Sequence, residues 1–571
     1  PDQAERSNGI GRGRDRARHS GALSHTGACG ALSRSSLVWA TIQGFPGLPA
    51  CPGLLFGSMT HPTDALPIPD TQSERDERHL AIQRVGVKGV RYPLKVRVAG
   101  QVQQDAANIR GLILASAKST FFAGADLKGV MRSTTDQGPR VFEEIEGVKK
   151  SFRTLETSGF PVVSCLNGSA LGGGLEVALV GHYRIATQNT KAIFGFPEIS
   201  LGLIPGAGGI TKMTRILGLM AAQPYLLECK LFNAEEAHRL GLVHEMVATD
   251  DQLRTQALHY IASVQGQPEA CQHVWDRKGY KMPGGTPSNP QIAGMLTVAP
   301  AMMKLKTHGL YPAPEAALAA MVEGAMVDFD TAMRIESRYL ATLMRGEVAR
   351  NMINTFFFNL NSYKADQSKL QAELGDKSAH RWVVNKGIPA AGLDYVQIFN
   401  TEALDGTQAY VQRAMAAYMH QAEILLAEGV SAVLIENLAV QAGMHIGPLK
   451  LKALLDRPTS SGTSATVQSN LSHLTGTALY QAIQDRLLYC QSVEAAKCLQ
   501  EGLLKAVHEA NIGAVFVLGF PACTGGTLQL IYAMGVDAFA VRCQALTQQF
   551  GAAFALTAEV VACLKKHQPQ Y

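Results

Sequence analysis

Three short runs constrain this chain more than any other feature: Leu-Gly-Gly-Gly-Leu-Glu at 171–176, Pro-Glu-Ile at 197–199 and Pro-Gly-Ala-Gly-Gly at 205–209. They place Glu176 and Glu198 22 positions apart, each near glycine-rich backbone that a ligand can approach closely. Two carboxylates around one water molecule titrate together, so that one can serve as acid while the other serves as base. Glycine amides beside them can stabilise a developing oxyanion. The pattern therefore predicts an acid–base active site.

A further run, Phe-Phe-Ala-Gly-Ala-Asp-Leu-Lys at 121–128, follows an apolar stretch at 111–115 that predicts a buried strand. Taken together and in this order, the runs resemble the crotonase (enoyl-CoA hydratase/isomerase) superfamily. They are most similar to the hydratase domain of the multifunctional α-subunit of the fatty-acid β-oxidation complex, over about residues 109–364. The resemblance implies an α/β spiral of ββα repeats.

The same resemblance assigns roles in the hydration of a 2-enoyl-CoA. Glu176 would orient and deprotonate the water, and Glu198 would deliver a proton to C2 of the substrate. The backbone N–H groups of Ala125 and Gly173 would form the oxyanion hole, and no metal is implied. The loop residues implied to bind the CoA thioester are Ala123, Asp126, Leu127 and Lys128.

Each of these residues also has a structural interpretation. Glu176 alone could be a first-turn helix residue favoured by the helix dipole, and Glu198 alone could be a surface turn residue. Asp126 and Lys128 could be a solvated pair. His182 stands where crotonases often have Asp, and we expect it to be structural and not catalytic.

Length and composition indicate a multidomain globular protein. The 571 residues suggest roughly three or four domains, and 46% hydrophobic with 17% charged residues is ordinary for a soluble protein. A net charge of +5 does not favour a nucleic-acid partner. Ten cysteines without a CxxC pair predict reduced thiols in a cytoplasmic enzyme. The apolar stretch 35–58 is broken by Gly and Pro, which argues against a membrane span.

The amino-terminal region departs from the crotonase pattern. The first methionine is Met59, and we expect 1–58 to be a disordered or non-native leader. Residues 68–103 resemble the amino-terminal segment of type IB GTP cyclohydrolases and stop before that family's catalytic region. They stand where a crotonase has further strands, so the spiral is predicted to be incomplete at its amino terminus. We expect 1–90 to be mobile, and 92–104 either to pair with the strand at 111–116 or to leave it exposed.

Local patterns predict further elements. Residues 141–155 have helical spacing, and a strand is expected at 161–166. Further strands are expected at 192–195 and, after a helix, at 242–243. The glycine triplet is expected to open a helix at Glu176.

The second half predicts an all-α region that contains an internal repeat. Leu-Ala-Glu-Gly-Val at 426–430 and Leu-Gln-Glu-Gly-Leu at 499–503 are offset by 73 positions, and duplicated units of this kind usually pack together. Both copies resemble the carboxy-terminal domains of 3-hydroxyacyl-CoA dehydrogenase. That family also has an NAD-binding domain, but Lys364 and Tyr410 are only 46 positions apart and enclose no GxGxxG. We therefore expect neither NAD nor another cofactor.

These observations give a division of the chain and two hypotheses for its function. The first is an enoyl-CoA hydratase (a lyase) with a vestigial dehydrogenase half, acting on acyl-CoA and assembling with a thiolase subunit or with itself. The second is a catalytically inert composite of incomplete pieces that at most binds acyl-CoA or a partner. The predicted segments are a leader at 1–58, a cyclohydrolase-like fragment at 59–104, the hydratase domain at 105–300, a helical tether at 301–365, a linker in place of the NAD-binding domain at 366–408, and two helical units at 409–470 and 471–571.

Overall fold

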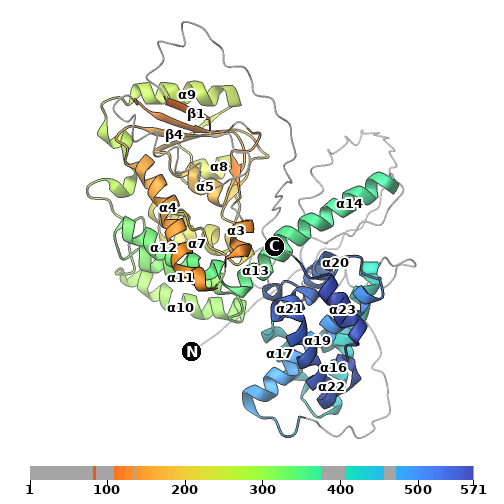
Figure 1. Cartoon of the computed structure of the whole chain (residues 1–571). Helices are drawn as coiled ribbons and strands as arrows, with labels where there is room; N and C mark the ends of the chain where they lie inside the picture. Colours follow the sequence, from red (N-terminus) through yellow and green to blue (C-terminus); the bar gives the residue numbers. More distant parts are fainter. Residues whose placement is uncertain are drawn as a thin grey trace, which may run out of the picture. The chain divides into compact units, whose positions relative to one another are not determined.

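The computed structural model describes residues 81–84, 109–116, 118–124, 127–133, 135–374, 406–455 and 471–569. Its strands form two parallel sheets, a larger one in the order β1-β2-β4-β6-β8 and a smaller one in the order β3-β5-β7 (Figure 1). The strands are β1 (Ala81–Arg84), β2 (Leu112–Ala115), β3 (Phe122–Ala123), β4 (Val162–Leu166), β5 (Ala170–Leu171), β6 (Tyr183–Thr187), β7 (Phe194–Gly195) and β8 (Glu245–Val247).

From β2 onward, successive strands alternate between the two sheets. β2, β4 and β6 belong to the larger sheet, and each is followed along the chain by a strand of the smaller sheet and then by one or more helices. This order matches the ββα spiral that the resemblance implies. The helices and 3₁₀ turns involved are α3 (Leu127–Arg132), α4 (Gly138–Glu156), α5 (Gly173–Ala178), η4 (Glu198–Leu201), α6 (Gly209–Leu217), α7 (Leu219–Leu227) and α8 (Ala234–Arg239).

Helices cover both faces of the larger sheet, which explains why its strands are apolar on both sides. Leu112 and Val162 lie in a core cluster with side chains of α4. Their neighbours Ile113 and Val163 point to the opposite face and pack with α9 (Asp250–Ser263). A parallel strand buried on both faces reads as a continuous apolar run, which is how β4 could be predicted.

The amino-terminal prediction is wrong at one point. β1 pairs in parallel with β2, with Ala81 opposite Leu112, so residues 81–84 form a strand and the edge of β2 is not exposed. Since β2 has β4 on its other side, no edge of β2 is left for residues 92–104, and the spiral has an upstream strand after all. A buried strand needs hydrogen-bond partners on both sides. For β2, residues 81–84 supply the partners on one side and β4 supplies those on the other. Residues 92–104 themselves lie outside the described residues.

Most predicted elements of this region are confirmed, with shifted ends. The predicted helix 141–155 is α4, and the predicted strand 161–166 is β4. The strand expected at 242–243 is wrong, because these residues form a buried turn and β8 begins three positions later. The guanidinium of Arg184 hydrogen-bonds the carbonyl of Leu242 there, which takes that carbonyl out of any ladder.

A series of helices follows the sheets. α11 begins at Pro312, where the missing N–H of proline suits a first helical turn. The π-helical segment η7 continues α13 without a break. The elements are α10 (Pro290–Thr307), α11 (Pro312–Gly324), α12 (Phe329–Met344), α13 (Glu347–Ile353), η7 (Asn354–Asn359) and α14 (Leu360–Leu374).

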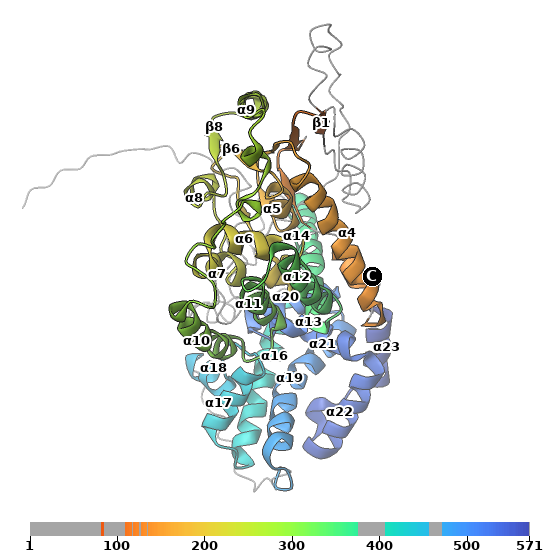
Figure 2. The ribbon, with the colours of Figure 1, turned by 90° about the vertical axis from the view of Figure 1, so that its left-hand side faces the viewer.

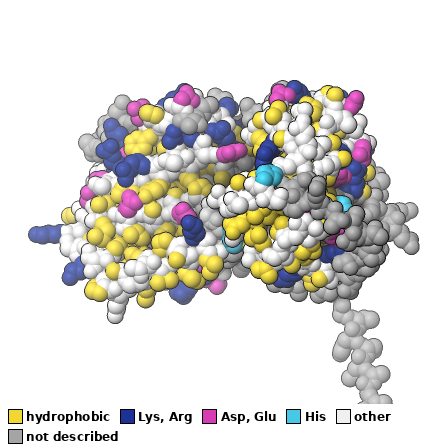
Figure 3. Space-filling view, turned by 90° about the horizontal axis from the view of Figure 1, so that it is seen from below, with side chains coloured by type: hydrophobic (Ala, Val, Ile, Leu, Met, Phe, Trp, Pro, Cys, Tyr) yellow, Lys and Arg dark blue, Asp and Glu magenta, His cyan; other side chains and the backbone are white. Residues whose placement is uncertain are grey.

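Helix α10, which the sequence patterns did not reveal, contributes little to the core. Its apolar residues Met295, Val298, Met302 and Leu305 are each more than half exposed, and their spacing puts them on one face of the helix. Hydrophobic side chains also gather on the face of the molecule seen in Figure 3, the side on which α10 lies in Figure 1. Only Ile292 of α10 is a buried hydrophobic residue.

The carboxy-terminal part is helical throughout the described residues. Its elements are α16 (Gly406–Ala427), α17 (Ala432–Gln441), α18 (Pro448–Leu454), α19 (Gly476–Gln500), α20 (Val507–Gly513), the π-helical η9 (Ala514–Leu518), η10 (Ala522–Thr524), α21 (Thr527–Met534), α22 (Val536–Phe550) and α23 (Ala558–Lys566). All of them except η10 contribute to one large core cluster. Ala522 and Cys523 of η10 belong instead to the main core cluster of the preceding part of the chain.

The two copies of the internal repeat pack against each other. Their long helices, α16 and α19, lie side by side (Figures 1 and 2). Each is followed by a glycine of left-handed conformation, Gly429 with φ 88° and Gly502 with φ 73°. The later turns of the two copies also meet, since the His445 N–H donates to the Gly519 carbonyl at 3.0 Å.

Two classes of feature are absent from the part of the chain that the structure describes. None of its helices has the length and hydropathy needed to cross a bilayer. Nor does it bring together three or more His, Cys, Asp or Glu side chains in a way that could hold a metal ion.

Candidate active site

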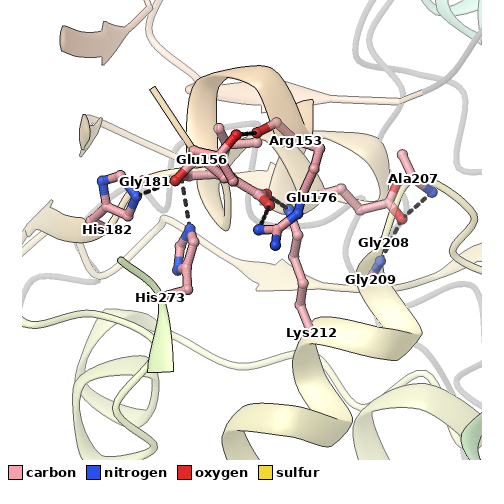
Figure 4. Close-up of polar contacts among 12 residues, drawn as sticks. Arg153, Glu156, Glu176, Gly181, His182, Ala207, Gly208, Gly209, Lys212 and His273 are labelled. Carbon is pink, nitrogen blue, oxygen red and sulfur yellow. Dashed lines mark hydrogen bonds and ion pairs between the residues drawn. The ribbon is translucent and has the colours of Figure 1, made fainter. Parts of the chain in front are cut away.

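Glu176 lies at the start of α5 and reaches across to another helix. Its side chain is buried, and its Oε1 accepts hydrogen bonds from the N–H groups of Ala207, at 2.6 Å, and Gly209, at 2.8 Å (Figure 4). These two N–H groups belong to the turn that opens α6, where amides have no acceptor within the helix and the dipole favours a negative charge. Glu176 is therefore not a surface residue stabilised only by its own helix, and its carboxylate is held in one orientation.

Glu198 begins η4, directly after β7. The residue is half-buried, and its Oε2 is buried and has no hydrogen-bond partner among the described residues. A Cβ atom on Gly172, the residue before α5, would overlap its Oε1, so the carboxyl lies against the glycine triplet. Burial, and then the charge of Glu176, raise the pKa of Glu198 well above its ordinary value. This environment favours the protonated acid.

The first turn of α5 also supplies a hydrogen-bond donor. Gly173 is the first residue of the helix, and its N–H has no backbone acceptor among the described residues. The loop after β3 packs closely on this turn, because a Cβ on Gly173 would lie 3.2 Å from the Gly124 carbonyl oxygen, and a Cβ on Gly174 would overlap the Phe122 carbonyl. The two loops predicted to form an oxyanion hole are therefore neighbours.

The remaining predicted site residues lie in or next to this loop. Ala125 and Asp126 are outside the described residues, and of Ala123 only the backbone, within β3, is described. Leu127 is buried in the main core cluster, whereas Lys128 is exposed at the start of α3. A role for these residues in CoA binding stays a prediction.

A third glutamate, which sequence analysis missed, binds the same turn. Glu336 of α12 is fully buried and accepts hydrogen bonds from the N–H groups of Gly208, at 2.7 Å, and Thr211, at 2.9 Å. The Nζ of Lys149, from α4, lies 3.0 Å from its Oε1. The only local signal in the sequence was a charged residue on the apolar side of a predicted helix.

Residues 98–277 match the family model of enoyl-CoA hydratase/isomerase. This hydratase/isomerase segment contains both predicted catalytic glutamates and the glycine triplet, whereas Glu336 lies beyond it. The match, together with the two-sheet spiral, gives this part of the chain a crotonase-like fold.

The chain is also similar to proteins that are named fatty acid oxidation complex subunit alpha. The chain is 30% identical over 258 residues to the fatty acid oxidation complex subunit alpha of Shewanella loihica. The aligned region covers 45% of this chain and 35% of that protein. The chain is 29% identical over 342 residues to the subunit of the same name from Idiomarina loihiensis. That aligned region covers 58% of this chain and 45% of the relative. The chain thus spans less than half the length of these relatives.

Solved structures of hydratases and isomerases are also similar to the chain. The enoyl-CoA hydratase of Bacillus halodurans has 21% identity and a TM-score of 0.33, and covers 47% of this chain and 90% of its own. Human mitochondrial delta3-delta2-enoyl-CoA isomerase has 20% identity and a TM-score of 0.36, and covers 50% of this chain and 96% of its own.

A buried ion cluster joins two helices near the candidate site (Figure 4). Lys212 of α6 pairs with Glu156 of α4, and both side chains are fully buried. Arg153 reaches the other oxygen of Glu156 at 3.4 Å and also pairs with Asp276 (Figure 4). Because each buried charge has an opposite charge beside it, the cluster can join α4 to α6 without leaving an unpaired ion in the core.

His182 has a structural environment. Its Nδ1 accepts a hydrogen bond from the Val162 N–H at 3.0 Å, so its Nε2 carries the proton and donates to the Glu156 carbonyl at 2.9 Å (Figure 4). Burial lowers the pKa of His182 to about 4. Both ring nitrogens are engaged with backbone, which leaves neither to act on a substrate.

Proposed function

We propose that the chain is an enoyl-CoA hydratase of fatty-acid β-oxidation, which adds water to a 2-trans-enoyl-CoA to give a 3-hydroxyacyl-CoA. The observation that supports this most directly is the unlike environment of the two glutamates. Glu176 accepts two hydrogen bonds from backbone amides, which favour its charged form, while burial and the charge of Glu176 favour the neutral acid at Glu198. A base and an acid side by side are what the addition of water requires.

In the proposed reaction one carboxyl group acts on the water molecule that adds to C3, and the other acts on C2 of the enoyl group. Glu176 takes a proton from the water, whose oxygen bonds to C3 of the enoyl group. Glu198 gives its proton to C2, and the thioester oxygen carries the developing charge between these events. The Gly173 N–H, and the Ala125 N–H as the resemblance implies, would donate to that oxygen. The proton gained by Glu176 then returns to Glu198 through solvent, which restores both groups.

The presence of two glutamates favours hydration over isomerisation. Moving a double bond along a chain needs a group that transfers a proton, whereas adding water also needs a group that activates the water. The nearness of both carboxyl groups to the glycine triplet supports a shared site: a Cβ on Gly172 would overlap Glu198 Oε1, and a Cβ on Gly173 would lie 3.8 Å from Glu176 Oε2. The carboxy-terminal helices would then be a vestigial dehydrogenase half, and a thiolase subunit or a second copy of the chain are the partners that we propose.

The test is turnover of crotonyl-CoA, followed by loss of the absorbance of the enoyl thioester. Glu176→Gln and Glu198→Gln should each lower kcat by roughly 10²–10⁴, the usual effect of losing a positioned acid or base. Glu235→Gln, a change of the same kind at an exposed site on α8, should have no effect. Unchanged rates in either active-site variant would refute the roles assigned.

The competing hypothesis of an inert composite makes a different prediction for the unmodified chain. If that hypothesis holds, the folded protein leaves the absorbance of the enoyl thioester unchanged, whether or not it binds crotonyl-CoA. Incubation with 3-hydroxybutyryl-CoA and NAD should yield no NADH, because the sequence lacks the glycine-rich unit that holds the dinucleotide. NADH formation above background would contradict the vestigial assignment.

A further inference from the structure

Two buried glutamates share the amides at the start of α6, and they do so in alternation. Ala207 and Gly209 donate to Glu176, at 2.6 and 2.8 Å, while Gly208 and Thr211 donate to Glu336, at 2.7 and 2.9 Å. The Gly208 N–H, which donates to Glu336, therefore lies between the two N–H groups that donate to Glu176. A shift of the turn that breaks one set of bonds must disturb the second set.

Glu336 is buried in the core beside a lysine and several hydrogen-bond donors. Its side chain is 0% exposed, and the Lys149 Nζ, itself almost fully buried, lies 3.0 Å from Oε1. The Thr211 hydroxyl donates to Oε2 at 3.0 Å, in addition to the two backbone N–H groups. The carboxylate thus has a counter-ion and three hydrogen-bond donors, an arrangement that compensates for its removal from water.

The turn itself has little rigidity of its own. Four of its five residues, at 205–209, are Gly or Ala, and Gly208 has φ 108°, a conformation that other residues rarely adopt. The packing around it leaves no spare room, since a Cβ on Gly208 would lie 2.9 Å from the terminal methyl group of Met333, one helical turn before Glu336. A flexible turn needs external contacts to hold its amides in place, and Glu336 supplies the contact to Gly208.

We propose that Glu336 is a positioning residue for the catalytic base: it fixes the turn 205–209 whose amides orient the Glu176 carboxylate. The inference deepens the proposed hydratase function and rests on it. Glu336 acts from outside the reacting site, because its bonds go to α6 and α4. It is also one of the charges that raise the pKa of Glu198, after burial and the closer influence of Glu176.

The test uses a pair of changes that removes both buried charges. Glu336→Gln alone would leave Lys149 unpaired, so the variant to examine is Glu336→Gln with Lys149→Met in the full chain. The matched control is Glu428→Gln with Arg486→Met, which removes a buried ion pair (2.6 Å) from the carboxy-terminal helices. Both variants lose one buried pair, but only the first touches the amides of α6.

Two measurements decide the proposal. Hydrogen exchange of the backbone amides, followed by mass spectrometry, should become at least tenfold faster in peptides covering 205–212 of the first variant and stay unchanged there in the control. With crotonyl-CoA, kcat should fall about 10- to 100-fold in the first variant, as expected for a misplaced catalytic group, with KM within about twofold. The control should keep kcat within about twofold wherever it remains folded.

Each possible outcome bears on the proposal. Unchanged exchange at 205–212 in the first variant overturns it, as does unchanged kcat in an active protein. A loss of kcat that the control shares equally also overturns it, because general loosening would then account for the effect. If the unmodified chain does not hydrate crotonyl-CoA, the proposed function fails, while the exchange measurement still shows whether Glu336 holds the turn.

Discussion

The carboxyl group of Glu198 lies against the backbone of Gly172, so closely that a Cβ atom there would overlap Oε1. Gly172 has φ 58° and ψ −127°, a conformation that residues with a side chain avoid. The glycine triplet thus does more than open α5. It leaves the space in which the second carboxyl group of the candidate site stands, and this links the first and second sequence runs in three dimensions.

Gly172→Ala should therefore abolish most of the activity. The added methyl group must displace Glu198, and we expect kcat for crotonyl-CoA to fall at least about 100-fold, by analogy with other misplaced catalytic groups. Gly241→Ala is the matched control, because Gly241 also has a left-handed φ of 72° but has open space where the Cβ would be. Both variants should lose some stability, but only the first should lose activity. Equal activity in the two would show that Glu198 can move without consequence.

Glu198 should also give the protein a characteristic dependence of stability on pH. Its pKa is raised above the ordinary 4.5 in the folded state by burial and by Glu176, so between these two values the folded chain keeps a proton that the unfolded chain releases. Its contribution to stability is therefore full below pH 4.5 and is lost as the pH rises through the folded pKa. Urea unfolding from pH 4.5 to 8 should show Glu198→Gln becoming progressively more stable than the unmodified protein. Glu235→Gln should follow the unmodified protein, and parallel curves for all three would contradict the raised pKa.

Buried histidines predict the opposite trend on the acid side. Burial lowers the pKa of His182 to about 4 and that of His244 to about 3, so the unfolded chain takes up their protons first as the pH falls below 6.5. Stability should then decline by up to about 1.4 kcal/mol per pH unit for each histidine. His182→Gln should reduce this slope between pH 6.5 and 4.5, whereas His259→Gln, at an exposed site on α9, should not. Identical slopes would mean that His182 is protonated in the folded protein.

How far the sequence predicted the structure depends on whether the information was local. β4 was predictable because all five of its residues are buried. Glu176 and Glu198 stand in recognisable local runs, although the glycine that lies against the Glu198 carboxyl, Gly172, is remote from it in sequence. Glu336 was not predictable, because the N–H groups that it binds lie up to 128 positions away. No local pattern specifies which helix will deliver a carboxylate to a distant turn.

The amino-terminal strand illustrates a second limit. The four residues of β1, Ala-Ile-Gln-Arg, show too short an alternation to stand out in the sequence, and the prediction therefore considered residues 92–104 as the partner of β2. What decides between such candidates is which of them can reach the open edge of β2, and that depends on the path of the whole chain. The helix α10 was missed for a related reason, since many of its apolar residues, such as Met295, Val298, Met302 and Leu305, are exposed and do not face the core.

A polar contact between α13 and the carboxy-terminal helices gives the last prediction. Gln529 of α21 is buried, donates to the Asn351 Oδ1 at 2.9 Å and accepts from the Asn354 amide, while Asn351 donates to the Cys523 carbonyl at 3.3 Å. Replacing Gln529 by Met leaves two buried groups without this partner, the Asn351 Oδ1 and the Asn354 side-chain amide N–H. We expect a loss of about 1–3 kcal/mol for each unsatisfied group, measured by denaturant unfolding.

The same contact has a functional side, because α13 lies against η4. A Cβ on Gly202, the residue that ends η4, would lie 2.9 Å from Ala349 of α13, so a displaced α13 would press on the turn that carries Glu198. Gln529→Met should therefore lower kcat for crotonyl-CoA as well as stability, although it is remote in sequence from the site. Gln544→Met, at an exposed position of α22, should leave kcat unchanged. It should change the free energy of unfolding by no more than about 0.5 kcal/mol, as is usual for surface substitutions. A destabilised Gln529→Met protein with full activity would show that the carboxy-terminal helices do not support the candidate site.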